Sequence, residues 1–313
     1  MELLGYVDRT FGLGDGAYMS MGGLALEDHR LFHDHFLSRR LLTFDNDPAT
    51  VSRQKFNRPY SFIKCEEMSS SQFVNDFGTI ASNSGSAGPF VVWLDYTSPK
   101  ERNAQLREIQ QLVTQMSSRD IVKVTLNANP RTLAPSGISL AYEQFREEAA
   151  STLQQQLGDY ATPELLHAGQ MDAPGVASIL VDAVRLASVA GVEGARNLSI
   201  RPLTSFRYID AVHQMLTVTL IVAEDEDWEA LVDSGLLDWP FASSGWEAPR
   251  QIRVPSLTIK EQLRLAEEVL VNDPAQIVAN LPFQLGTRSE STRQIKEYVR
   301  HYRRYPTFVP ISV

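Results

Sequence analysis

Short apolar runs alternate with amphipathic segments through roughly the first 130 residues of the chain. The segments between the runs carry apolar residues three and four positions apart, which is typical of helices that pack on one face. Strands that alternate with helices in this way predict right-handed crossovers and a parallel sheet covered on both faces. We therefore expect an α/β fold with a Rossmann-like, mostly parallel sheet. The apolar runs that resemble strands are residues 17–21, 40–44, 60–65, 90–94 and 121–126.

The alternation is interrupted in the middle of the chain. Residues 131–170 hold a charged, helix-like segment and loops, so we interpret them as an insertion that could act as a lid. Residues 173–192 are apolar, but Asp182 and Arg185 interrupt them, which favours a buried helix over a membrane span. Two β-rich runs within residues 198–223 then predict an antiparallel hairpin at one edge, which completes a seven-stranded sheet.

The last part of the chain has the pattern of a helical extension. Thr258 and Glu261 form a capping-box pattern at the start of one predicted helix, and a second helix spans roughly residues 292–303. We therefore divide the chain into a Rossmann-like domain, residues 1–223, and a mainly helical C-terminal extension, residues 224–313.

Three of the predicted strands stop at polar residues. The second ends at Asp45 and Asn46, the fourth at Asp95, and the fifth at Asn127, with Asn129 two positions later. The carboxyl ends of parallel strands lie at one edge of a sheet, and ligands bind in the crevice there. The sequence therefore predicts one ligand site built from these three strand ends.

An acidic residue at the end of the second strand is typical of nucleotide sites, where it binds ribose hydroxyls about 20 residues after a glycine turn. Asp45 follows Gly23 by 22 residues, and Gly22 precedes Gly23. NAD-type sites and S-adenosylmethionine sites both use this arrangement, but the glycine pair lacks the G-x-G-x-x-G spacing of the former. The segment from Gly12 to Gly16 has glycine spacing but precedes the first strand, so a plain turn is favoured there.

The run from Arg40 to Pro48, the segment from Phe62 to Glu66 and the turn from Trp93 to Tyr96 together resemble class I S-adenosylmethionine-dependent methyltransferases. Within that superfamily the chain is most similar to small O-methyltransferases of the catechol type, over roughly residues 15–225. The resemblance implies a Rossmann-like fold, S-adenosylmethionine as the cofactor, and methyl transfer to an oxygen or nitrogen atom.

The resemblance also implies roles for particular residues. Asp45 would bind the ribose hydroxyls, and the backbone of Gly22 and Gly23 would approach the methionine part of the cofactor. Asp95 would open the active-site turn, where it could serve as a general base or as a ligand of a hard metal ion. The expected cofactor-binding residues are Met21, Gly22, Gly23, Asp45, Asn46, Glu66, Glu67 and Asp95, with Glu66 or Glu67 near the adenine. The expected catalytic residues are Asp95, Tyr96 and Asn127.

A metal ion is not part of the expected site. Asn127 and Asn129 stand where the resemblance implies an acidic ligand, and one carboxylate with neutral oxygen donors makes only a weak magnesium (Mg) site. His29 and His33 have the i, i+4 spacing that can chelate zinc, but no third ligand follows the pattern. We interpret these histidines as a solvated or ligand-facing helix surface.

The net charge of -9 and the pI near 5.2 argue against nucleic acid or an anionic membrane as the main partner of the surface. Residues 293–304 carry five lysines or arginines with interleaved tyrosines, which could contact phosphates, but a helix with cations at its negative end is favoured. A protein partner could bind through residues 224–313. The single cysteine, Cys65, fits a cytoplasmic protein, and we expect no secretory signal.

The leading functional hypothesis is a cytoplasmic S-adenosylmethionine-dependent methyltransferase, a transferase whose acceptor the sequence does not identify. The main alternative is a catalytically inactive Rossmann-like module that serves as a scaffold in a multi-protein assembly. An NAD-type enzyme is a third, less favoured alternative. Binding of S-adenosylmethionine would separate the first hypothesis from the other two.

Overall fold

The structure is a computed structural model that describes residues 1–134, 141–162, 166, 170–195, 197–210, 213–253, 255 and 257–304. The chain divides into two compact units, Met1–Arg250 and Gln251–Val313, which are described separately. The division falls later than the expected one between residues 223 and 224. The reason is that α8 (Asp225–Asp233) buries Leu231 in a core of the first unit.

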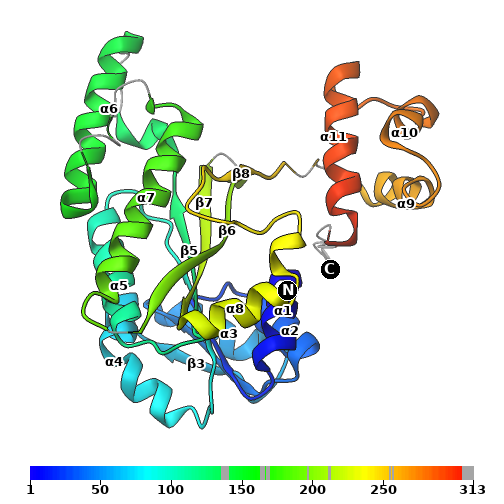
Figure 1. Ribbon diagram of the computed structural model, residues 1–313. Coiled ribbons are helices and arrows are strands. Elements are labelled where there is room, and N and C mark those ends of the chain that lie inside the picture. The colour runs from blue at the N-terminus through cyan, green and yellow to red at the C-terminus, as the bar shows by residue number, and fades with distance from the viewer. Residues whose placement is uncertain are drawn as a thin grey trace. The chain divides into compact units, whose positions relative to one another are not determined.

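The first unit is built on one eight-stranded sheet with the order β3-β2-β1-β4-β5-β7-β6-β8 (Figure 1). Strands β3, β2, β1, β4 and β5 are parallel, whereas β7 runs antiparallel to both β5 and β6. This order confirms the predicted parallel sheet with an antiparallel hairpin, and the short β8 is an addition to the seven expected strands. The strands are β1 Ala17–Ser20, β2 Arg40–Asp45, β3 Lys64–Glu67, β4 Phe90–Asp95, β5 Ile121–Asn127, β6 Ser199–Asp210, β7 His213–Ala223 and β8 Arg250–Gln251.

Helices connect the parallel strands, and capping side chains determine where several of them begin. Asp47 accepts hydrogen bonds from the backbone at the start of α3, where Pro48 occupies the first turn. Ser69 and Gln72 form a capping box at the start of α4. The other helices of this unit, besides α8, are α1 Glu2–Phe11, α2 Glu27–Phe36, α3 Pro48–Asn57, α4 Ser70–Asn83, α5 Arg102–Thr114, α6 Tyr142–Leu157 and α7 Ala173–Gly191.

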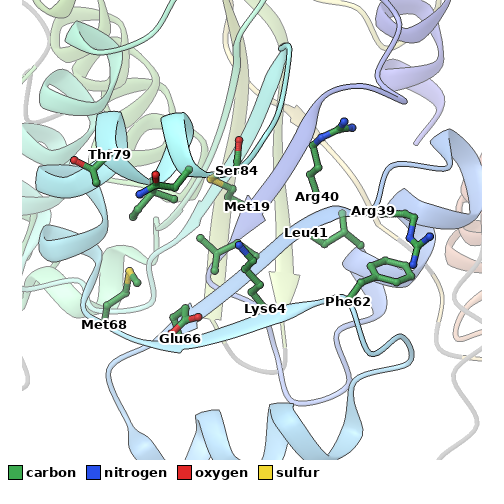
Figure 2. Close-up of a pocket in the computed structure, with 13 residues that line it drawn as sticks. Met19, Arg39, Arg40, Leu41, Phe62, Lys64, Glu66, Met68, Thr79 and Ser84 are labelled. Atoms are coloured by element: carbon green, nitrogen blue, oxygen red, sulfur yellow. The ribbon is translucent and has the colours of Figure 1, made fainter.

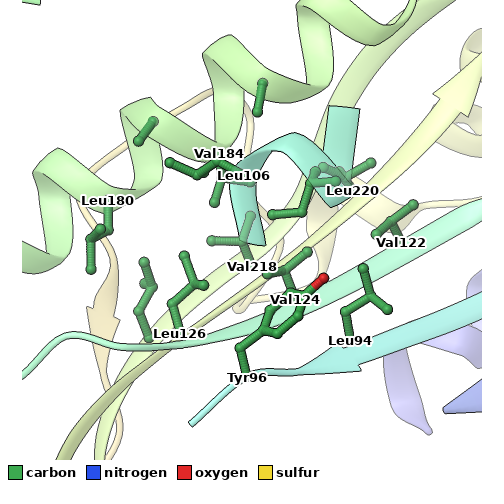
Figure 3. Close-up of a cluster of buried hydrophobic side chains, with 14 of the residues drawn as sticks. Leu94, Tyr96, Leu106, Val122, Val124, Leu126, Leu180, Val184, Val218 and Leu220 are labelled. Carbon is green, nitrogen blue, oxygen red and sulfur yellow. The ribbon is translucent and has the colours of Figure 1, made fainter. Parts of the chain in front are cut away.

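Two apolar cores flank the sheet. One lies between the sheet and helices α4, α5, α6 and α7, where Leu106 and Val184 of the helices pack with Leu94 and Val124 of the strands (Figure 3). The other lies on the opposite face, against α1, α2, α3 and α8, and includes Phe32. Helices therefore cover both faces of the sheet, as the sequence pattern predicts.

Among the described residues, α7 is the one helix that is long and apolar enough to cross a membrane. Ten of its residues are nevertheless buried, including Leu180 and Val184, and the helix packs against α5 and β7. Helix α7 thus lies in the core of the unit, as expected for residues 173–192.

The third strand lies later in the sequence than predicted. The aromatic pattern at residues 60–65 resembles a strand, but Tyr60 and Phe62 stack with ring centroids 5.2 Å apart and pack against His33 of α2. The backbone turns at this point, since the N–H of Ile63 donates to the Tyr60 carbonyl at 3.1 Å. Strand β3 therefore begins only at Lys64.

The described part of the second unit contains three helices around a small core of its own. A capping box precedes each of them, at Thr258, Asp273 and Thr287. Only two helices were expected in residues 224–313, so α8 and the middle helix of this unit are additions. Tyr298 is buried in the core, which favours packing over nucleic-acid contact for residues 293–304. The helices are α9 Ile259–Glu268, α10 Pro274–Asn280 and α11 Arg288–His301.

Candidate active site

The carboxyl ends of β1, β2 and β4 lie side by side, and the strand register shows which residues share a level. Ser20, at the end of β1, pairs with Thr43 of β2 and with Trp93 of β4. Asp45 and Asp95 each lie two residues further along their strands, beyond the end of β1. Because β1 lies between β2 and β4, and neighbouring strands are about 4.8 Å apart, the two aspartates are separated by two strand spacings, or roughly 10 Å. The structure therefore brings Asp45 and Asp95 to one edge, with the glycine turn between them.

The turn after β1 contains two glycines in different surroundings. A Cβ on Gly22 would lie 2.5 Å from Oγ1 of Thr43, so only glycine fits there. The Gly22 N–H donates to the same oxygen at 3.2 Å, and the Gly22 carbonyl accepts from Gln54 at 2.7 Å. At Gly23, by contrast, a Cβ would have no heavy atom within 4 Å. Gly22 thus anchors the turn to the protein, whereas Gly23 leaves its backbone accessible to a ligand.

Asp28, in the first turn of α2, links this helix to the sheet. Its Oδ2 accepts hydrogen bonds from the hydroxyls of Tyr18 and Ser20 at 2.8 and 2.7 Å, and its Oδ1 lies 3.1 Å from Nδ1 of His29. Burial acts to raise the pKa of Asp28, but the hydrogen bond and charge of His29, together with the two hydroxyls, outweigh it and hold the pKa well below its usual range. Asp28 therefore places a negative charge beside the end of β1.

His29 does not belong to a solvated or ligand-facing surface, so that interpretation is wrong for this residue. Its side chain is fully buried, and Nε2 lies 3.0 Å from the Leu42 carbonyl. In the part of the chain that the structure describes, no group of three or more His, Cys, Asp or Glu side chains could hold a metal ion.

The glycine segment from Gly12 to Gly16 is a turn at the opposite edge of the sheet, because it leads into the first residue of β1.

Asp45 keeps one carboxylate oxygen available at the end of β2. Its Oδ1 accepts a hydrogen bond from the N–H of Asp47 at 2.8 Å, and within the described residues its Oδ2 has no partner. The cap of the following helix is Asp47, so Asp45 is not needed for that role. Asn46, Glu66 and Glu67 are exposed nearby, and Glu67 pairs with Asp45 across the β2–β3 register. Binding of a cofactor by these residues stays a prediction.

Polar side chains continue from Asp95 across the sheet, on the face that α1 and α2 cover. Asp95 pairs with Thr125, which in turn pairs with Thr217. Two residues earlier along β4 and β5, Trp93 pairs with Lys123. Nε1 of Trp93 donates to Oγ1 of Thr125 at 2.9 Å, and Nζ of Lys123 lies 3.4 Å from the centroid of the Trp93 ring. Nearer the amino ends of the strands the same face is apolar. The face thus changes from apolar to polar toward the carboxyl edge.

The charges in this cluster influence one another. Burial raises the pKa of Asp95, and the charge of Lys123 reduces that shift. Burial lowers the pKa of Lys123 to about 8, while Asp95 and Asp28 act in the opposite direction. Burial, Asp95 and Asp210 raise the pKa of Tyr208 to about 12, so the Tyr208 hydroxyl stays protonated at neutral pH. A carboxylate, an ammonium and a neutral phenol therefore meet at the carboxyl edge.

One of the predicted catalytic residues, Tyr96, points away from this cluster. Tyr96 is buried on the opposite face of the sheet, where its hydroxyl donates to Oε2 of Glu108 at 2.6 Å. The Asn127 side chain holds the loop after β5, since its Oδ1 accepts from the N–H of Asn129 at 3.1 Å. The Asn127 carbonyl accepts from the buried Arg102 at 2.6 Å. Of the three predicted catalytic residues, Asp95 belongs to the cluster and Tyr96 does not. The Nδ2 of Asn127 donates to the Thr97 carbonyl at 3.4 Å, in the loop after Asp95, and a catalytic role for Asn127 stays a prediction.

A groove of about 300 Å³ lies on the α4 side of the sheet (Figure 2). Met19 and Leu42 of the strands and Ile80 of α4 line it, together with Lys64, the first residue of β3. Of the predicted site residues, only Glu66 belongs to its lining, so the groove does not include Asp45 or Asp95.

Sequence reasoning did not single out Asp28, Lys123 or Tyr208 as site residues. A signal for Lys123 was present, because it is the one charged residue in the apolar run 121–126, and a lysine on a buried strand needs a reason. Tyr208 had no such signal, since its position near Asp95 depends on the pairing of distant strands.

The strand order and the polar carboxyl edge define the class of fold found in S-adenosylmethionine-dependent methyltransferases. Residues 1–313 match a family described as "Putative O-methyltransferase", and the chain belongs to that family. This membership confirms the methyltransferase class that the sequence resemblance indicates. Among curated proteins, none matches this chain.

Solved structures similar to this chain include three methyltransferases. The N-methyltransferase NodS from Bradyrhizobium japonicum WM9 is 14% identical, with 71% of this chain and 93% of that chain covered and a TM-score of 0.36. The 16S rRNA (adenine(1408)-N(1))-methyltransferase from Catenulisporales acidiphilia is 10% identical, with coverages of 71% and 90% and a TM-score of 0.35. A geranyl diphosphate methyltransferase in complex with GPP and sinefungin is 12% identical, with coverages of 70% and 76% and a TM-score of 0.30. With such scores, the assignment rests on the family match alone.

Proposed function

We propose that the first unit binds S-adenosylmethionine across the carboxyl ends of β1, β2 and β4 and transfers its methyl group to an acceptor hydroxyl. One observation carries the proposal: the accessible backbone of Gly23, a free carboxylate oxygen of Asp45 and the half-buried Asp95 lie at the same edge. The description of the family supports oxygen over nitrogen as the acceptor atom.

The residues at this edge fit the cofactor. A ribose presents neighbouring hydroxyls, and Oδ2 of Asp45 is an acceptor that the described protein leaves unused. The open space beside Gly23 lets a ligand approach the backbone closely. Glu67, which is exposed on β3 and pairs with Asp45, could receive the amino group of the adenine. When bound, the cofactor supplies an electrophilic methyl group on a positively charged sulfur.

Asp95 is the proposed acceptor of the proton that the hydroxyl loses. It lies half-buried at the end of β4, and burial raises its pKa toward the range in which a general base is effective. Tyr208 stays protonated, so its hydroxyl can donate a hydrogen bond to a group bound beside Asp95. Together these side chains can orient a hydroxyl and remove its proton, which are the two tasks that methyl transfer leaves to the protein.

Thermal unfolding tests the proposal. We expect S-adenosylmethionine and its demethylated product, S-adenosylhomocysteine, to raise the Tm, because a ligand that binds only the folded state stabilises it. Asp45→Ala should abolish the increase. Asp76→Ala, which removes an exposed carboxylate on α4, is the matched control and should preserve it.

The outcomes separate the functional hypotheses. No increase in Tm with either ligand at millimolar concentration contradicts the proposal, and an increase with NAD alone favours an NAD-type enzyme. If both ligands bind but no S-adenosylhomocysteine forms from S-adenosylmethionine with a panel of phenols and alcohols, a catalytically inactive binding module is favoured instead.

A further inference from the structure

Lys123 is a cation without an ion pair in the middle of a buried strand. Its neighbours Val122 and Val124 are buried, whereas its own side chain is half-buried and places Nζ 3.4 Å from the centroid of the Trp93 ring. In the part of the chain that the structure describes, no carboxylate lies within 4 Å of this nitrogen. Lysines removed from water are normally paired. The ammonium therefore has hydrogen-bond donors available for a bound anion.

The side chain of Lys123 reaches toward the glycine turn. Lys123 belongs to β5, but its nitrogen lies over Trp93 of β4, and Trp93 pairs with Ser20 at the end of β1. The turn begins there, with the N–H of Met21 donating to the Trp93 carbonyl at 3.2 Å. The ammonium thus lies on the side of β5 that faces the turn, where the methionine part of the cofactor is expected.

The charges around Lys123 match those of the expected ligand. Asp95 at the end of β4 and Asp28 at the start of α2 both act on Lys123, so two carboxylates lie around its ammonium. The methionine part of S-adenosylmethionine carries a sulfonium, an ammonium and a carboxylate, which are two positive charges and one negative charge. The two sets are complementary, and Lys123 is the one cation of the cluster that can receive the carboxylate.

We infer that Lys123 binds the carboxylate of the cofactor's methionine part and thereby determines specificity for a cofactor that carries an amino acid. The inference rests on the proposed function, since it requires S-adenosylmethionine at this edge. A charge-assisted hydrogen bond from the ammonium would hold the carboxylate above Trp93, between β5 and the glycine turn. Nucleotides without a carboxylate in this place would leave the ammonium unpaired and bind more weakly.

Isothermal titration calorimetry with two ligands tests this role. S-adenosylhomocysteine carries the carboxylate, and 5′-deoxy-5′-(3-aminopropylthio)adenosine has the same amine and thioether without it. Lys123→Met should weaken binding of S-adenosylhomocysteine by about 10- to 100-fold, the usual range for a hydrogen bond to a charged group, and change binding of the analogue less than about threefold. Lys123→Arg should retain much of the affinity, because it keeps a cation with donors.

The control variant is Lys64→Met, which removes an exposed lysine from β3 and should leave both affinities unchanged. Unchanged affinity of Lys123→Met for S-adenosylhomocysteine would overturn the inference. Equal weakening of both ligands would do so too, because it would assign Lys123 a structural role. If the wild-type chain does not bind S-adenosylhomocysteine at all, the proposed function itself is wrong.

The wild-type chain provides a second test that needs no variant. Because the pKa of Lys123 is about 8, the preference for S-adenosylhomocysteine over the analogue should fall roughly tenfold between pH 7 and pH 9, as the ammonium loses its proton. The other titratable groups around Lys123 are Asp95 on β4, Asp28 on α2, and Tyr208 and Asp210 on β6. A preference that stays constant over this range would contradict the inference.

Discussion

Replacing the two glycines of the turn after β1 separately should have opposite consequences. In Gly22→Ala the new methyl group would lie 2.5 Å from Oγ1 of Thr43, 2.9 Å from Cδ2 of Leu26 and 3.1 Å from Cε1 of His29. Overpacking of this kind costs about 1–3 kcal/mol, and loss of the hydrogen bond from Gly22 to Thr43 adds about 1 kcal/mol. We therefore expect Gly22→Ala to lower the free energy of unfolding by roughly 2–4 kcal/mol.

Gly23→Ala is the matched comparison, because its methyl group would meet no heavy atom within 4 Å. Restricting the unfolded chain by this substitution stabilises a protein by about 0.4–1 kcal/mol where the backbone is compatible, so stability should not fall. The same methyl group would occupy the space in which a ligand approaches the backbone. We expect Gly23→Ala to weaken binding of S-adenosylmethionine at least about tenfold, which corresponds to about 1.4 kcal/mol.

Urea unfolding measures the first effect and calorimetric titration with S-adenosylmethionine the second. A change of 2–4 kcal/mol corresponds to a decrease in Tm of roughly 5–15 °C for a unit of this size. If Gly22→Ala is as stable as Gly23→Ala, the packing around Gly22 is described wrongly. If Gly23→Ala binds the cofactor as tightly as the wild type does, the turn is not part of the cofactor site.

Two further predictions concern residues away from the turn. Burial raises the pKa of Asp120 to about 6, so the folded protein favours the protonated form of this side chain. The wild type should therefore lose roughly 2–3 kcal/mol of stability relative to Asp120→Asn as the pH rises from 4 to above 6. Urea unfolding across that range checks this, and a constant difference in stability would refute it. Tyr96→Phe removes the hydrogen bond to Glu108 on the far face of the sheet and should lower the free energy of unfolding by about 1–3 kcal/mol. The rate of S-adenosylhomocysteine formation should change less than about twofold. A larger loss of rate would support the catalytic role predicted from the sequence.

Much of the fold could be predicted because its elements carry local signals. The apolar runs that end at Asp45 and Asp95 belong to the parallel sheet as predicted, and the apolar helix before the hairpin packs in the core. Strand β3 was misplaced because the alternating aromatics Tyr60 and Phe62 resemble a strand, whereas their rings pack against His33 of a distant helix. Contacts between elements decided that case, and they are not visible in a local pattern.

The candidate site was predictable only in part, for the same reason. The spacing between the glycine turn and Asp45 is a property of one βαβ unit, so sequence reasoning could place both. The cluster around Lys123 depends on how β5 pairs with β4 and β7, and on how β7 pairs with β6, and β6 is separated from β5 by more than 70 residues. Tyr96 illustrates the converse, because adjacent strand residues point to opposite faces and only one of Asp95 and Tyr96 can face the cluster.

A crystal structure of the full chain with S-adenosylhomocysteine would test the central claim most directly. We predict that the ligand lies across the carboxyl ends of β1, β2 and β4, with its ribose hydroxyls within hydrogen-bond distance of Asp45 and its carboxylate beside Lys123. A ligand found in the groove beside Lys64 and Ile80, or in any position that leaves Asp45 without contact, would contradict the proposed site.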